Sequence, residues 1–115
     1  MKRRVVITGV GLVSALGSET KTTWEGLLEG RSGVAPITHF DASSFSTQIA
    51  AEVKDLDPLA YLDAKNARKM DRFILHAIAA SECAVSNSGL KVTPENSHRI
   101  GVYIGSGIGG FGTIE

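Results

Sequence analysis

The sequence Arg99-Ile100-Gly101-Val102-Tyr103-Ile104 runs directly into a glycine loop, Gly105-Ser106-Gly107-Ile108-Gly109-Gly110. Its first half is rich in apolar and β-branched side chains, which is typical of a strand covered on both faces. Residues 3–8 contain a similar run, Val5-Val6-Ile7, before Thr8-Gly9. We therefore expect one buried strand over residues 3–8 and a second over residues 99–104.

Helical patterns separate these two expected strands. Thr20 and Thr22 are able to cap a helix, and the residues after them have apolar side chains at helical spacing. Gly30 would end this helix, so a short helix is predicted between the threonines and Gly30. A longer helix, ending at Ser88-Gly89, is indicated by apolar residues at helical spacing, which are Met70, Phe73, Ile74, Ala77 and Ile78. Strands that alternate with helices predict an α/β layer with a mostly parallel sheet.

Shorter elements are expected between the two helices. Residues 31–46 show no period, which predicts a loop with a short extended piece, and residues 47–53 form a candidate strand. Asp57-Pro58 predicts a helical turn over residues 58–62, since proline is favoured at the first helical position. Phe111 to Glu115 resemble the start of a further element, so we expect the chain to be part of a longer protein.

Composition and charge exclude several classes of protein. The 115 residues are 43% hydrophobic and 21% charged, which is typical of a globular domain. Twelve basic residues balance twelve acidic ones, so no overall positive field is available for nucleic acid or a membrane surface. The longest uncharged stretches are too short to cross a bilayer as helices. This composition fits a cytoplasmic protein.

The cysteine and the histidines do not form a recognisable site. Cys83 has no second cysteine to pair with, and His39, His76 and His98 lack metal-ligand spacing, so a metal site is not expected. Cys83 lies among small residues of the longer helix, where a thiol behaves as an apolar side chain, and Glu82 should disfavour its ionisation. We assign none of these residues a catalytic role.

Two glycine turns are candidate cofactor sites. Gly105, Gly107 and Gly110 satisfy the G-x-G-x-x-G pattern after a predicted strand, and Gly9-Val10-Gly11 follows the first strand. Either turn could belong to a Rossmann-type NAD(P) oxidoreductase. A need for positive φ in the backbone explains the glycines of both turns better than cofactor binding does.

A basic stripe is the clearest sign of a partner. Lys65, Arg68, Lys69 and Arg72 recur at i, i+3, i+4 and i+7, which would place them on one face of a helix. Such a stripe suits an acidic protein surface or a phosphate. A face that is merely solvated explains the same charges equally well.

Several motifs together resemble one family. They occur in order along the whole chain: residues 2–11, Ser32-Gly33, His39-Phe40-Asp41, Arg68-Lys69-Met70-Asp71, Ser88-Gly89-Leu90 and residues 99–110. They resemble the amino-terminal part of the β-ketoacyl-[acyl-carrier-protein] synthase II family, the elongating condensing enzymes of bacterial fatty acid synthesis. Ala15 is a small departure, since many relatives have proline there.

The resemblance implies a fold and an assembly. The family has a thiolase-like layered α/β fold built of two similar halves and forms homodimers. Residues 1–115 would be the amino-terminal portion of the first half, an incomplete domain. The family's catalytic cysteine and two histidines would lie beyond Glu115, and Cys83 does not match that cysteine.

The resemblance also implies a function for particular residues. Lys65, Arg68 and Lys69 match the positions that dock the acidic acyl carrier protein, and Ile108, with Gly107 beside it, matches the apolar loop that borders and gates the acyl-chain pocket. The implied reaction is a decarboxylative Claisen condensation of malonyl-acyl carrier protein with an enzyme-bound acyl group, without a redox cofactor. The alternatives are a polyketide ketosynthase or its silent partner, the Rossmann-type oxidoreductase, and a non-enzymatic module for an acidic partner.

Overall fold

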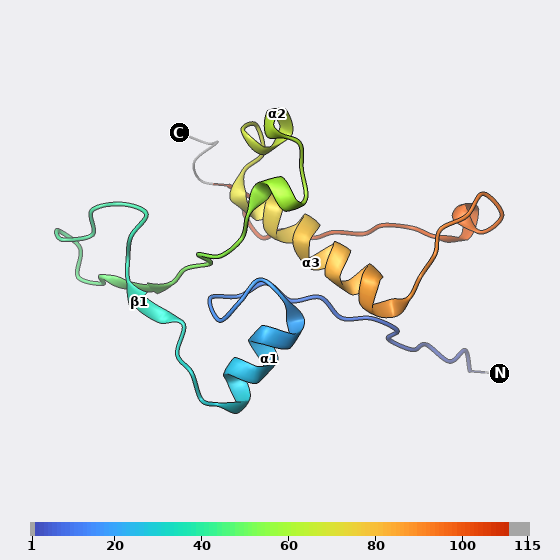
Figure 1. The fold of residues 1–115 in the computed structure, drawn as a ribbon, viewed down its shortest axis with the longest axis horizontal. Coiled ribbons are helices and arrows are strands. Elements are labelled where there is room, and N and C mark those ends of the chain that lie inside the picture. Colours follow the sequence, from blue (N-terminus) through green and yellow to red (C-terminus); the bar gives the residue numbers. More distant parts are fainter. Residues whose placement is uncertain (1, 111–115) are drawn as a thin grey trace.

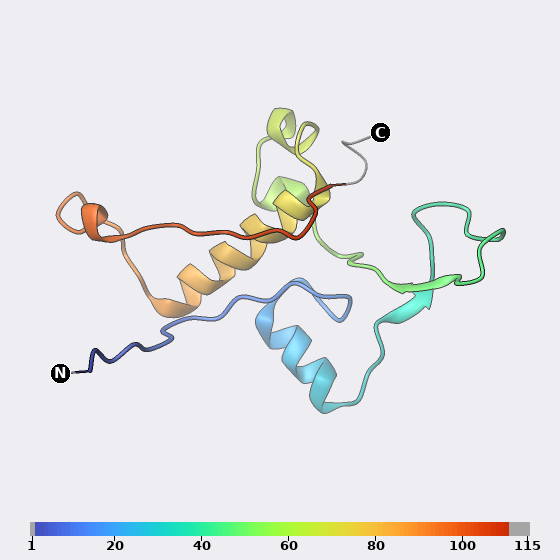
Figure 2. The same ribbon diagram turned by 180° about the vertical axis from the view of Figure 1, so that it is seen from behind.

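The computed structural model describes residues 2–110, and Figure 1 shows their course. The elements, in chain order, are α1 (Thr20–Leu28), β1 (Val34–Pro36), β2 (Ile49–Ala51), the 3-10 helix η1 (Pro58–Ala60), α2 (Ala64–Ala67), α3 (Arg72–Ser88) and the 3-10 helix η2 (Ser97–Arg99). Helix α3 is the longest, and both the amino-terminal segment and the segment after η2 run beside it (Figures 1 and 2). The element expected at Phe111 to Glu115 lies outside the described residues.

Local signals set both ends of α3. The Asp71 carboxylate accepts the Arg72 N–H at 2.7 Å and caps the first turn, and Gly89 ends the helix with φ 68°. The predicted end at Ser88-Gly89 is confirmed. Met70, which belongs to the predicted apolar pattern, lies outside α3, because Asp71 follows it as the N-cap of the helix.

The first glycine turn packs directly on α3. A Cβ added at Gly11 would collide with the Ala80 carbonyl oxygen, and one added at Gly9 would collide with that of Ala84. The amino-terminal segment therefore approaches α3 closely at its small residues Ala80 and Ala84. Neither Gly9 nor Gly11 has positive φ, so the expectation of left-handed turns is wrong here, and close packing is what excludes a side chain.

The sheet differs from the expected one. Among residues 2–110, the only sheet has two strands, antiparallel β1 and β2, with Val34 opposite Ala51. Residues 3–8 and 100–104 are not assigned as strands and Arg99 belongs to η2, so the predicted parallel pairing is not formed in this structure. A strand is defined by its hydrogen-bonded neighbour as well as by its sequence pattern.

The shorter predictions agree better with the structure. Helix α1 confirms the predicted helix, but its N-cap is Glu19 and not Thr20 or Thr22, which lie within the helix. Gly30 follows the helix with φ 67°. Strand β1 is the extended piece expected within residues 31–46, β2 lies within residues 47–53, and η1 is the turn expected at Pro58.

The described arrangement is open. Its radius of gyration is 17.3 Å, whereas a compact chain of this length has about 13 Å. The exposed area is 9464 Å², against roughly 6000 Å² for a folded monomer of the same mass. Among the described residues the buried apolar side chains are Ala42, Leu75 and Ala79. No described helix combines the length and apolar character needed to span a membrane.

Candidate functional site

Three of the predicted basic residues gather on one tight turn. Asp63 caps α2 by accepting the N–H groups of Asn66 at 2.9 Å and Lys65 at 3.0 Å, and these hydrogen bonds hold the pKa of Asp63 below its usual value. Lys65 lies in α2, Arg68 is its C-cap, and Lys69 follows with its N–H bonded to the Asn66 carbonyl at 3.0 Å. We call Lys65, Arg68 and Lys69 the basic turn.

The basic turn is exposed, but it is not the helical stripe expected from the spacing. All three side chains of the basic turn are exposed. Helix α2 ends at Ala67 and α3 begins at Arg72, so the prediction of one helix carrying four cations is wrong. The reason is local, since Asp71 begins a new helix instead of continuing the old one.

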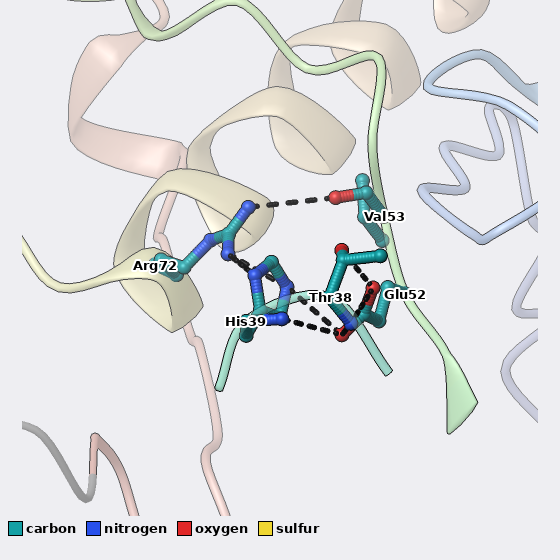
Figure 3. Close-up of polar contacts among 5 residues, drawn as sticks. All are labelled: Thr38, His39, Glu52, Val53 and Arg72. Carbon is teal, nitrogen blue, oxygen red and sulfur yellow. Dashed lines mark hydrogen bonds and ion pairs between the residues drawn. The ribbon is translucent and has the colours of Figure 1, made fainter. Parts of the chain in front are cut away.

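Arg72 has a different environment from the other three cations. Its Nη1 lies 2.9 Å from Nδ1 and 2.8 Å from Nε2 of His39, and its Nη2 donates to the Val53 carbonyl at 3.5 Å (Figure 3). The guanidinium is therefore engaged within the chain.

Glu52 is the buried centre of the polar cluster beside Arg72. Its side chain is 5% exposed and accepts the Thr38 N–H at 3.0 Å, the Thr38 hydroxyl at 2.7 Å and the His39 N–H at 3.3 Å (Figure 3). The hydroxyl of Thr38, then its amide, lower the pKa of Glu52 to about 2. His39 Nε2 lies 3.8 Å from the same carboxylate. A role for Glu52 or Thr38 is not predicted from the sequence, because no local pattern links these two residues.

The second glycine loop meets the amino end of α3. Gly110 lies against the Asp71 carboxylate, and a Cβ at Gly109 would stand 3.7 Å from the Phe73 ring. Gly109 has φ 86°, so positive φ is confirmed at this one position of the loop, whereas Gly105, Gly107 and Gly110 do not have it. Gly107 and Ile108 are exposed, with 72% of Ile108 accessible. The loop thus lies next to Asp71, close in the chain to the basic turn.

An apolar groove adjoins this loop. It has a volume of about 670 Å³ and runs between α3 and residues 102–106. Its lining residues are Phe73, Ile74, His76, Ala77, Ile78, Ser81, Val102, Ile104, Gly105 and Ser106. Burial, then the charge of Arg72, lower the pKa of His76, so its imidazole is neutral at neutral pH. The groove suits an apolar segment or ligand. Ile108 comes two residues after Ser106, which lines the groove.

Cys83 differs from the expectation in one respect. Its Sγ lies 3.3 Å from the Thr20 Oγ1, and this hydroxyl oxygen lies 3.1 Å from the Val10 carbonyl oxygen. The pKa of the thiol is lowered, chiefly by the hydrogen bond with Thr20, so its net shift is opposite to the expected one. Cys83 is half-buried and lines a separate cavity of about 460 Å³.

The first glycine turn does not have the geometry of a dinucleotide site. In such sites the glycines open a helix whose amino end faces the pyrophosphate. Here Gly9 and Gly11 face α3, and the chain continues through a bridge between Ser14 and Gly17 before α1 begins at Thr20. Over residues 2–110, no three His, Cys, Asp or Glu side chains are grouped so that they could hold a metal ion.

Comparison with known proteins identifies relatives along nearly the whole chain. The model of the family described as "Beta-ketoacyl synthase, N-terminal domain" matches residues 2–115. The proteins named 3-oxoacyl-[acyl-carrier-protein] synthase 2 of Coxiella burnetii and Vibrio harveyi are 56% and 54% identical over 114 residues. The protein of the same name from Staphylococcus aureus strain COL is 45% identical over 113 residues. These matches cover 98–99% of this chain but only 27–28% of each relative.

A solved structure supports the same relationship. The ishigamide ketosynthase/chain length factor superposes with a TM-score of 0.69 and is 37% identical in sequence. The superposition covers 79% of this chain and 23% of that structure. The chain therefore spans about a quarter of the proteins it resembles.

Proposed function

This chain belongs to the β-ketoacyl synthase family, matching its amino-terminal domain over residues 2–115, and we propose that the full-length protein elongates fatty acids. The fold is the amino-terminal part of the layered, thiolase-like α/β fold that the sequence predicts. The observation that carries the proposal is the 45–56% identity, along nearly all of this chain, to relatives named 3-oxoacyl-[acyl-carrier-protein] synthase 2.

The proposed reaction is a decarboxylative condensation. An acyl group passes from acyl carrier protein to an enzyme cysteine, with the carrier thiol released. Malonyl-acyl carrier protein then loses CO₂, and the resulting carbanion attacks the enzyme thioester, which frees the cysteine and gives 3-oxoacyl-acyl carrier protein two carbons longer. No electrons are transferred, so no redox cofactor is needed. We place the reactive cysteine and histidines outside this chain.

We assign carrier docking to the basic turn, Lys65, Arg68 and Lys69. Three exposed cations on one hydrogen-bonded turn form a local positive surface on a chain whose formal net charge is zero. Such a surface attracts an acidic protein and raises its rate of association.

We assign the border of the acyl-chain pocket to Ile108 and Gly107. The loop that holds them adjoins the apolar groove, and Gly109 adopts a φ of 86° that other residues rarely tolerate. A bulky apolar side chain between glycines can change position without moving the flanking helix.

The full-length protein is further proposed to be a cytoplasmic homodimer, of which residues 1–115 form an incomplete domain. Support comes from the exposed apolar segments, since Val5, Ile7 and Val102 are 90%, 85% and 86% accessible. Side chains of this kind are normally buried against a sheet or a partner.

A polyketide ketosynthase or its silent partner is the second candidate. The solved relative named a ketosynthase/chain length factor favours it. The product separates the silent partner from the fatty acid enzyme, because a silent partner forms no longer chain. An active polyketide ketosynthase makes the same two-carbon extension, so that alternative is separated only by whether a saturated acyl chain is accepted as the primer.

The test is a product assay with the full-length protein. It is incubated with malonyl-acyl carrier protein and a saturated acyl-acyl carrier protein, and mass spectrometry follows the carrier-bound product. We expect a 3-oxoacyl species two carbons longer, with one CO₂ released per product. Decarboxylation without a longer product, or no reaction with any acyl carrier protein, would contradict the proposal.

A further inference from the structure

The two ends of the segment that carries the basic turn lie together. The chain leaves β2, forms η1 and α2, and returns at the start of α3 (Figure 1). Val53 and Arg72 flank this segment, residues 54–71, and the Arg72 Nη2 donates to the Val53 carbonyl at 3.5 Å. Fixing the two ends of a loop removes much of the conformational freedom between them.

Two further residues orient Arg72. Its Nη1 lies 2.8 Å and 2.9 Å from the ring nitrogens of His39, and a guanidinium can only donate. His39 is placed by Glu52, which accepts its N–H at 3.3 Å and lies 3.8 Å from its Nε2 (Figure 3). Three parts of the chain therefore meet at one point. We call the residues drawn there the clasp: Thr38, His39, Glu52, Val53 and Arg72.

Residues 54–71 rest on α3 through half-buried side chains, and none of their side chains is fully buried. A small cavity of about 110 Å³ lies between the segment and α3, lined by Leu56, Leu62, Met70 and, from α3, Leu75 among others. A segment with few buried contacts opens easily unless its ends are fixed.

We propose that Arg72, oriented by His39 and Glu52, is a positioning residue that holds the basic turn in place for carrier binding. This inference rests on the proposed function. A preorganised surface binds more tightly because less freedom is lost on association. Lys69 and Arg72 are separated by only Met70 and Asp71, so movement at the clasp reaches the basic turn directly.

Two variants of the full-length protein separate positioning from charge. Arg72→Lys keeps the positive charge, but a single ammonium lacks the planar fork that spans His39 and Val53. Glu52→Gln removes a negative charge, so electrostatics alone would strengthen binding of an acidic carrier, whereas loss of positioning would weaken it. Arg99→Lys is the matched control, since Arg99 lies in η2, beyond the carboxyl end of α3.

Two measurements are made on each variant. Steady-state kinetics compare acyl-acyl carrier protein with an acyl thioester that carries no protein, and hydrogen exchange follows the amides of residues 54–71. We expect both clasp variants to exchange faster there and to raise KM for the carrier-bound substrate roughly five- to tenfold. The kcat, and the kinetics with the small thioester, should stay unchanged, as should every property of Arg99→Lys.

The outcomes are distinct. Faster exchange with an unchanged KM for the carrier would overturn the inference, because the clasp would then be structural only. Unchanged exchange in Arg72→Lys would also overturn it, even if Glu52→Gln fails to fold. Failure of the proposed function is recognised separately, since the wild-type protein would then give no condensation product while the exchange measurement still reports on the clasp.

Discussion

The low pKa of Glu52 depends on the groups that donate hydrogen bonds to its buried carboxylate. Its pKa is lowered from 4.5 to about 2 by the Thr38 hydroxyl, then by the Thr38 amide. A lowered folded-state pKa stabilises the fold above the unfolded value and loses that effect as pH falls through the folded value. The contribution of Glu52 should therefore be complete above about 4.5 and disappear as pH approaches about 2.

This pH dependence can be measured against Glu52→Gln in the full-length protein. The difference in free energy of unfolding between wild type and variant should be largest near neutral pH and shrink steadily below pH 4.5. A difference that does not change between pH 6 and pH 3 would show that the carboxylate has no such role.

Ile108 is the second residue with a testable role. If it borders the acyl-chain pocket, Ile108→Trp in the full-length protein should lower kcat/KM for the longest acyl carriers at least roughly tenfold and spare short ones, because added volume has no room in a packed site. Ile108→Leu, of equal volume, should keep the wild-type profile. A uniform loss over all chain lengths would place Ile108 outside the pocket border.

At the scale of elements, the contact between α3 and the first glycine turn should be sensitive to a single methyl group. A Cβ at Gly11 would meet the Ala80 carbonyl oxygen, which is backbone and cannot move aside. We expect Gly11→Ala to destabilise the full-length protein by about 2 kcal/mol or more in a denaturant titration. At the control position, Gly101, an added Cβ meets nothing within 4 Å. Equal stability of the Gly11→Ala and Gly101→Ala variants would contradict this packing.

The sequence predicts those elements whose signals are local. Gly89 ends α3 and Pro58 starts η1 as expected, because glycine and proline act on their own backbone. Met70 fits the apolar spacing but lies before α3, because Asp71 caps the helix after it. Residues 3–8 and 99–104 have strand-like sequences, but pairing depends on neighbours that a sequence pattern does not specify.

The same distinction applies to the candidate site. The basic turn could be predicted because its three cations are close in sequence, although their placement on one helix was wrong. The clasp could not be predicted from the sequence, because His39 and Arg72 are 33 positions apart and Thr38 and Glu52 are 14 positions apart. Contacts between distant polar residues leave no periodic pattern in the sequence.

At the scale of the whole molecule, the open arrangement predicts how residues 1–115 behave alone. Their exposed area is about one and a half times that of a compact monomer of equal mass. We expect the isolated chain to retain helical circular dichroism, to bind a hydrophobic dye and to melt without a cooperative transition. A sharp, cooperative transition of the monomeric chain would instead show a self-sufficient domain.

The central claim is that the basic turn docks an acidic carrier for a condensing enzyme, and charge reversal in the full-length protein tests it most directly. Arg68→Glu with Lys69→Glu converts attraction into repulsion at an exposed surface. A second double variant, Lys91→Glu with Arg99→Glu, changes the net charge equally but lies beyond the carboxyl end of α3. It is therefore the matched control.

The measurement is KM for acyl-acyl carrier protein beside KM for an acyl thioester that carries no protein, at low and at high salt. The account predicts a rise of roughly tenfold or more for the carrier substrate in the Arg68/Lys69 variant alone, diminishing at high salt because exposed charges are screened over about 8 Å at physiological ionic strength. The small thioester should be unaffected. Equal losses with both substrates at an unchanged melting temperature, or equal effects of the two double variants, would contradict the docking role.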